Sequence, residues 1–208
     1  MASVARYARR RVGDERLMSA SVATFELDCE AATRDRGFSH RMLAAVVYNE
    51  GAYPDEILRQ VVNRCRLRGV RLAGIIQHRP RDPGHRCDML LEDLATRRQT
   101  SIFASRGRGA KGCQLDEYAM LKVVSEIELA LKNGPELVVL NKFGKVEAEG
   151  MGMRDLITQA VCRGIPVIVG VPARNLQAWR EFAGEFSVEL NSSGDVDEWL
   201  RCRLTKRG

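Results

Sequence analysis

The stretch Leu137–Gly150, LVVLNKFGKVEAEG, decides the fold and marks a candidate site. Its first four residues, LVVL, form a continuous apolar run, which is typical of a strand that is buried on both faces. The residues that follow are densely polar: Asn141, Lys142, Gly144, Lys145, Glu147 and Glu149. Ligands of open α/β sheets bind beyond the carboxyl ends of the strands, so this loop is well placed to hold one. A solvated connection between a strand and a helix is the alternative interpretation.

Apolar runs and helical periods alternate on both sides of this stretch. Further buried strands are predicted over Leu43–Tyr48, Val70–Gln77 and Pro166–Val171, and an edge strand over Phe186–Leu190. Helices are predicted from Pro54 to Gly69 and over Leu115–Lys132, Arg154–Arg163, Leu176–Phe182 and Val196–Leu204. The short segments Cys87–Leu94 and Gln99–Ala104 predict a hairpin. This alternation predicts a three-layer α/β fold with a mostly parallel sheet of about five strands and helices on both faces.

Residues 1–41 differ from the rest of the chain. They are rich in Arg, Ala, Ser and acidic residues and show little periodic apolar pattern. A transit peptide would be basic and poor in acids, so the acidic residues argue against one. We therefore predict a flexible N-terminal extension over residues 1–41 and one α/β domain over residues 42–208.

Composition narrows the kind of ligand. The chain has 208 residues, a formal net charge of +6 and 45% hydrophobic residues, which is enough for a substantial core. No apolar run approaches the length of a membrane span, so no membrane association is predicted. The basic residues are diffuse and lack interleaved aromatics, which argues against nucleic acid. A small anionic ligand fits this charge, and nothing in the sequence identifies a protein partner or a cofactor.

The cysteines point to a reducing compartment. The six of them are scattered, with no Cys-x-x-Cys pair and no secretory signal before them. We therefore predict reduced thiols in a cytoplasmic protein. His78, His85 and Cys87 lie close in sequence but fit no standard zinc spacing, so no metal site is predicted.

A second candidate loop, Ser105–Asp116 (SRGRGAKGCQLD), is basic and rich in glycine. It places Arg106, Arg108 and Lys111 between glycines that let consecutive backbone amides turn inward around an anion. Guanidinium groups add planar donors that suit phosphate, sulfate or molybdate. A flexible basic surface loop is the alternative interpretation. Cys113 follows the last glycine of this stretch, beside its basic residues, and core packing is the default role for a cysteine.

The junction between the first predicted strand and helix, Tyr48–Pro54, is where a nucleotide-binding α/β domain would carry its phosphate loop. That loop needs Gly-x-x-x-x-Gly-Lys-Ser/Thr, and this segment has one glycine and no lysine, serine or threonine. Glu50, Asp55 and Glu56 would repel a triphosphate. This junction should not bind phosphate in the usual way.

Residues 140–147, LNKFGKVE, resemble the Asp-Glu-x-Gly-x-x-Glu segment of small P-loop nucleoside-triphosphatases, with Gly144 and Glu147 at matching spacing. The chain from about Met42 to Leu190 also resembles a bacterial domain-of-unknown-function family of that superfamily, often encoded near molybdate transport. The residues that support this second resemblance are CDMLL (87–91), GCQLD (112–116) and NKFGK (141–145). The resemblance implies a degenerate P-loop fold and a link to molybdate handling.

The departures from the active enzymes concern catalysis. In those enzymes the acid at the strand end helps hold magnesium and the next acid helps activate water. Asn141 and Lys142 stand at those places here, and the phosphate-loop lysine is also absent. Loss of all three parts together argues for a domain that binds rather than hydrolyses.

The sequence thus predicts a binding or sensor protein for an oxyanion or nucleotide. Both loops are expected to meet at the carboxyl end of the sheet, and the ligand-binding residues would be Arg106, Arg108, Lys111, Asn141, Lys142, Lys145 and Glu147. One alternative is an enzyme of nucleoside-triphosphatase type in which Glu147 or Glu149 replaces the lost acids. We expect these glutamates instead to face solvent or to pair with the lysines. The other alternative is a partner-binding module that uses the basic tail.

Overall fold

The computed structural model of the chain describes residues 41–49, 51–52, 54–78, 90–104 and 114–204. Within these residues, one mixed sheet has seven strands in the order β4-β3-β2-β7-β8-β1-β9. Its five parallel strands are β1 (Leu43–Tyr48), β2 (Leu72–His78), β7 (Leu137–Leu140), β8 (Val167–Pro172) and β9 (Ser187–Leu190). The other two, β3 (Leu90–Asp93) and β4 (Gln99–Ser101), pair in antiparallel fashion beside β2.

The sheet is therefore wider than the five or so strands that the sequence predicts. The predicted hairpin is present, and its two strands extend the same sheet beyond β2. A hairpin can join a sheet wherever an edge strand has unpaired backbone N–H and C=O groups. The side of β2 that does not pair with β7 has such groups. The five parallel strands lie within about two residues of their predicted places.

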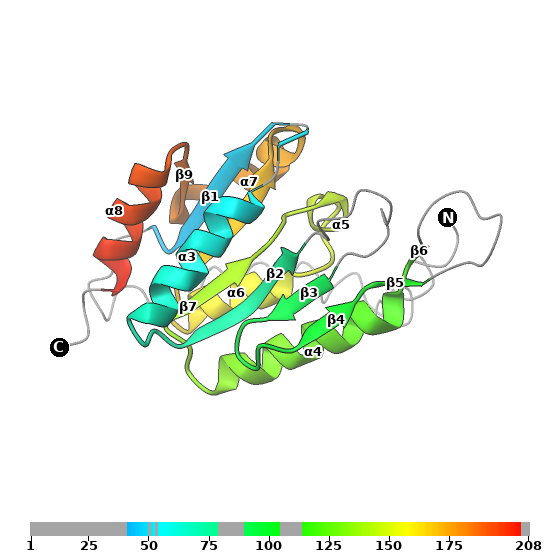
Figure 1. Ribbon diagram of the computed structural model, residues 1–208. Coiled ribbons are helices and arrows are strands. Elements are labelled where there is room, and N and C mark those ends of the chain that lie inside the picture. Colours follow the sequence, from blue (N-terminus) through cyan, green and yellow to red (C-terminus); the bar gives the residue numbers. More distant parts are fainter. Residues whose placement is uncertain (1–40, 50, 53, 79–89, 105–113, 205–208) are drawn as a thin grey trace. The chain divides into compact units, whose positions relative to one another are not determined.

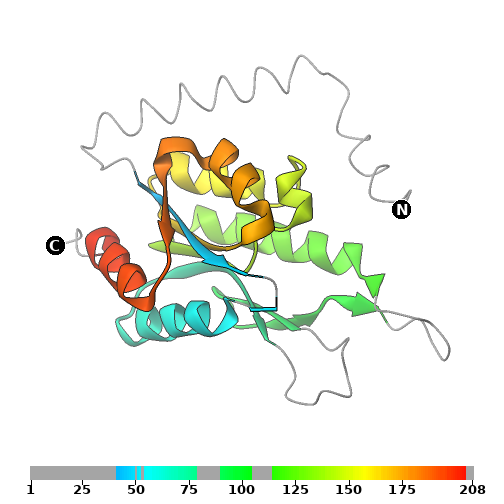
Figure 2. The same cartoon turned by 90° about the horizontal axis from the view of Figure 1, so that it is seen from above.

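Helices cover both faces of the sheet (Figures 1 and 2). They are α3 (Asp55–Leu67), α4 (Glu117–Lys132), α5 (Lys145–Ala148), α6 (Arg154–Cys162), α7 (Leu176–Ala183) and α8 (Ser193–Leu204). One face is covered by α3 and α8, whose Leu58 and Trp199 belong to the same apolar cluster as Val139 of the sheet. The opposite face is covered by α4, α6 and α7. The three-layer α/β fold predicted from the sequence is confirmed.

Local sequence explains the buried face of α3 and the first residue of α4. In α3 the buried side chains Leu58, Val61, Val62 and Cys65 form one apolar stripe. Helix α4 begins at Glu117 rather than at the predicted Leu115. Asp116 caps it by accepting a hydrogen bond from Ala119 N at 3.0 Å. Leu115 belongs instead to the short strand β6 (Gln114–Leu115), which pairs with β5 (Phe103–Ala104).

Two findings bear on the predicted organisation of the chain. None of the helices in the described residues is long and apolar enough to cross a bilayer. Residues 1–40 lie outside the described part, so the flexible extension stays a prediction.

Candidate functional site at the carboxyl edge of the sheet

The connection between β7 and α6, residues 141–153, crosses the carboxyl edge of the sheet. Its first residue, Asn141, is 7% exposed. The Asn141 side chain accepts a hydrogen bond from Gln77 N at 3.0 Å and donates one to Gln77 Oε1 at 3.3 Å. The amide therefore ties the end of β7 to the end of β2. Because both polar atoms of the Asn141 side chain are bonded to Gln77, this residue stabilises the loop rather than offering a group to a ligand.

Phe143 fixes the middle of the β7–α6 connection. Its backbone N–H donates to Gly170 O at 2.8 Å, and its carbonyl accepts from Asn175 Nδ2 at 3.0 Å. The Phe143 ring is fully buried and lies 5.2 Å from the Trp179 ring in an edge-on arrangement. Aromatic pairs of this geometry add to the stability that burial gives. The connection is thus held on β8 and α7, although it contains little regular structure.

Glu147, in the short helix α5, differs from its prediction. It is 8% exposed, and its carboxylate accepts hydrogen bonds from Gly144 N at 2.8 Å and Met153 N at 3.2 Å. Gly152 lies directly against it, because a Cβ added there would come within 2.2 Å of Glu147 Oε1. The expectation that Glu147 faces solvent or pairs with a lysine is therefore wrong. The reason is that nearby orphan amides attract a carboxylate more effectively than a solvated lysine does.

The two lysines of this connection differ in their surroundings. Lys145 is 86% exposed and lies 3.6 Å from Glu149, which is a weak surface pair. Lys142 is half-buried, and its stem lies beside Gly144, 3.8 Å from where a Cβ would stand. Among the described residues, no acceptor or carboxylate contacts the Lys142 ammonium group. Lys142 is therefore a cation of this connection that has no acidic partner in the described part of the chain.

The β1–α3 junction is described in part, since residues 50 and 53 lie outside the described ranges. Ala52 N donates to Asn49 O at 3.1 Å across a tight turn in which Gly51 has φ +81°. Pro54 is buried and packs on Gly170, where an added Cβ would lie 2.5 Å from Pro54 Cγ. A proline ring also offers no N–H to an anion. That the junction does not cradle phosphate stays a prediction.

A buried ionic cluster joins β2, β3 and α3 and was missed by sequence reasoning. Glu92 is 7% exposed and accepts from Arg66 Nη2 at 2.7 Å, while His78 Nε2 lies 2.5 Å from its other oxygen. Burial raises the pKa of Glu92, but the hydrogen bonds and charges of Arg66 and His78 outweigh it, so the pKa is lowered. The pairing of Ile76 with Glu92 and of His78 with Leu90 puts these side chains on one face. Only the register reveals this, because the residues are far apart in sequence.

Several residues that the sequence analysis considers for ligand or metal binding, or for a reactive thiol, lie outside the described part of the chain. They are Arg106, Arg108, Lys111, His85, Cys87 and Cys113. The convergence of the basic loop with the β7–α6 connection therefore stays a prediction. Within the described ranges, no group of three His, Cys, Asp or Glu side chains is placed to hold a metal ion.

The fold and this edge define the class of protein: a three-layer α/β domain of P-loop-like architecture, with a polar connection where such domains bind ligands. The chain belongs to the family described as "Protein of unknown function (DUF2478)", which matches residues 43–199. The predicted membership of an unknown-function family is thus confirmed. The predicted gene neighbourhood near molybdate transport is not tested by this match.

The chain is also similar to a protein of Bradyrhizobium diazoefficiens, "Molybdenum import ATP-binding protein ModC 2". The two are 33% identical over 162 residues, which is 76% of this chain. The chain spans only 18% of that protein's length. No solved structure matches the chain.

Proposed function

We propose that this domain binds a small oxyanion or a nucleotide at the carboxyl edge of the sheet and does not hydrolyse nucleotides. The observation that carries the proposal is Lys142, a half-buried cation without an acidic partner among the described residues, on a connection that is fixed at both ends. Because the backbone on both sides of Lys142 is fixed, anion binding there costs less conformational freedom than on a mobile loop. Arg106, Arg108 and Lys111 of the basic loop would complete the site.

The surroundings of the edge support binding rather than catalysis. Asn141 uses its amide on Gln77, and Glu147 uses both carboxylate oxygens on backbone amides. Glu147 is therefore poorly placed to accept a proton from water, which weakens the alternative of a rearranged enzyme. Glu149 is exposed and lies 3.6 Å from Lys145, so nothing encloses it beside a position where a substrate could bind.

Molybdate is the oxyanion that the comparison favours. The similar protein is described as a molybdenum import ATP-binding protein, and this chain corresponds to less than a fifth of it. A segment of that size need not be the part that binds ATP. A domain that senses molybdate beside an import ATPase fits both the similarity and the absent catalytic groups.

Binding is tested by calorimetry with molybdate, tungstate, sulfate, phosphate and ATP. Lys142→Ala should weaken the best anion about ten- to a hundredfold, since a charge-assisted contact contributes roughly 1.5–3 kcal/mol. Lys122→Ala is the matched control, because Lys122 is an exposed lysine within α4. Equal affinity in wild type and Lys142→Ala would show that the anion binds elsewhere.

Hydrolysis is tested separately. Purified protein should release no phosphate from ATP or GTP with magnesium above the rate of a buffer blank, because the phosphate-loop lysine and both strand-end acids are absent. A coupled phosphate-release assay measures this. Turnover that persists through purification and is lost in Glu149→Gln would favour the enzyme alternative.

A further inference from the structure

A cavity of about 360 Å³ lies near the amino ends of β2 and β7, away from the edge described above. Its apolar wall includes Val70, Leu72 and Leu94, and three arginines, Arg66, Arg71 and Arg97, also line it. No acidic side chain is among its lining residues. Pockets of this size accept small organic molecules.

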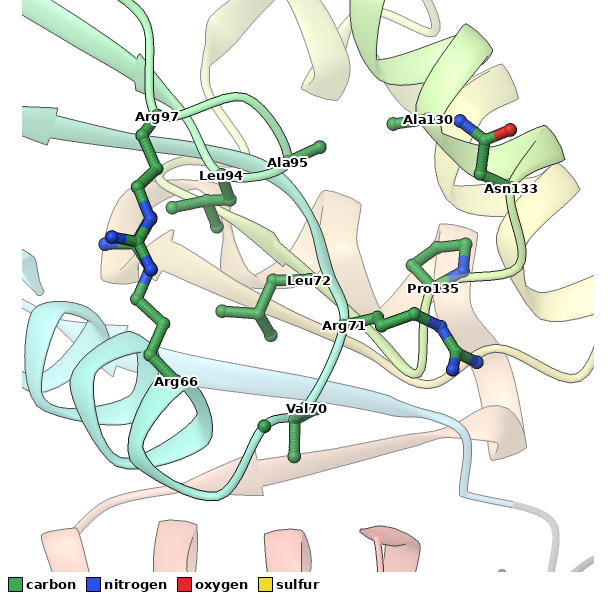
Figure 3. A pocket seen from close by; sticks show the side chains of 11 residues that line it. Arg66, Val70, Arg71, Leu72, Leu94, Ala95, Arg97, Ala130, Asn133 and Pro135 are labelled. Atoms are coloured by element: carbon green, nitrogen blue, oxygen red, sulfur yellow. The ribbon is translucent and has the colours of Figure 1, made fainter.

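The three arginines are held in different ways. Arg66 donates to buried Glu92 at 2.7 Å, and Arg71 donates twice to Gly134 O, at 3.2 and 3.0 Å. The backbone N–H of Arg97 donates to Asp93 O at 2.8 Å, but no hydrogen bond or ion pair of the Arg97 guanidinium group is found within the described ranges. Figure 3 shows Arg66 from α3 and Arg97 from the β3–β4 loop reaching toward one another along one wall. Glu92 offsets the charge of Arg66, whereas no acidic side chain among the described residues offsets the charge of Arg97.

The helix dipole gives a structural reason for the arginine at position 66 but not for the one at position 97. Arg66 lies in the last turn of α3, where a cation stabilises the carbonyl end of a helix. Arg97 belongs to no helix, and its backbone has φ +62°, a left-handed conformation that favours glycine. The loop therefore keeps a large cationic residue at a position where glycine would cost less. Strained backbone of this kind is a reason to look for a ligand.

We propose that this cavity is a second anion site, for an organic anion that carries a carboxylate or phosphate group on an apolar body. The anionic group would lie between the guanidinium groups of Arg66 and Arg97, which suit planar, two-point contacts with oxyanions. The apolar body would rest on Leu72 and Leu94. This site is independent of Lys142 and of the function proposed above.

The test uses benzoate and phenyl phosphate as probes. Inorganic phosphate, which lacks the apolar body, and phenol, which lacks the anionic group, are the control probes. Wild-type protein should bind the first two in a saturable manner, and chemical shifts of residues 94–97 should move in heteronuclear NMR spectra. At this cavity, measured from the same chemical shifts, phosphate and phenol should bind at least tenfold more weakly; phosphate bound beside Lys142 would not move these shifts. Arg97→Gly should weaken benzoate and phenyl phosphate about ten- to a hundredfold.

Arg97→Gly also separates a binding role from a structural one. Glycine accepts φ +62° without strain, so the melting temperature should stay the same or rise. Lys142→Ala should leave benzoate affinity unchanged, which distinguishes this site from the carboxyl edge. The proposal is overturned if neither probe saturates, if Arg97→Gly binds them as wild type does, or if this variant melts several degrees lower.

Discussion

Glu147→Ala is expected to lower the free energy of unfolding by about 2–4 kcal/mol. Two charge-assisted hydrogen bonds of roughly 1.5–3 kcal/mol each are lost, and water that reaches the freed amides offsets part of this loss. The amides of Gly144 and Met153 would then lack their partner. Urea unfolding followed by tryptophan fluorescence measures the change, since Trp179 packs directly on Phe143 of the same connection. Anion binding at Lys142 should weaken as well, because the connection loses its anchor.

Glu149→Ala is the control for this prediction. Glu149 is two residues away, is exposed and contacts only Lys145 at 3.6 Å among the described residues. Its removal should change stability by less than about 0.5 kcal/mol. If the two alanine variants unfold at the same urea concentration, Glu147 does not anchor the connection.

Gly74→Ala should have the largest effect on the fold. Gly74 lies within β2 with φ +108°, and an added Cβ would come within 2.0 Å of Val139 O in the neighbouring strand β7. A contact with backbone cannot be relieved by rotating a side chain, so the two strands must separate. We expect a loss of more than about 4 kcal/mol, which belongs to the extreme of single substitutions.

The matched variant is Gly69→Ala, which shares a positive φ with Gly74 but not the contact. Gly69 has φ +70° with nothing within 4 Å of an added Cβ. It should therefore cost only the strain of the left-handed conformation, about 1–3 kcal/mol. Thermal unfolding followed by circular dichroism compares the two. Equal melting temperatures would show that β2 and β7 adjust to the methyl group.

Most of the sheet could be predicted because its strands are buried on both faces. LAAVVY at residues 43–48 and LVVL at residues 137–140 are continuous apolar runs, and both strands begin and end where predicted. The first residue of α4 was harder to predict from the sequence, since it depends on β6 pairing with β5 and on the cap at Asp116. Apolar periodicity also could not show that the hairpin would extend the main sheet.

The candidate site was harder to predict than the fold. The position of the β7–α6 connection follows from the strand before it, but the direction of each side chain does not. Gly144 followed three residues later by Glu147 matches the spacing at which a carboxylate caps a helix, and that signal could have identified the role of Glu147. The cluster of Arg66, His78 and Glu92 has no such signal. It depends on an antiparallel register that only the folded chain defines.

The place of β1 in the sheet has a consequence for biosynthesis. Although β1 is the first described strand, its partners are β8 and β9, and Leu43 pairs with Val167 and Ser187. A nascent chain leaving the ribosome therefore cannot pair β1 with either neighbour until residues 167–190 have emerged. Parallel pairing across such long sequence separations is slow and leaves apolar strands exposed meanwhile. During translation, LAAVVY thus stays unpaired for a long stretch of synthesis and is a segment on which a chaperone is expected to act, although its first four residues end buried.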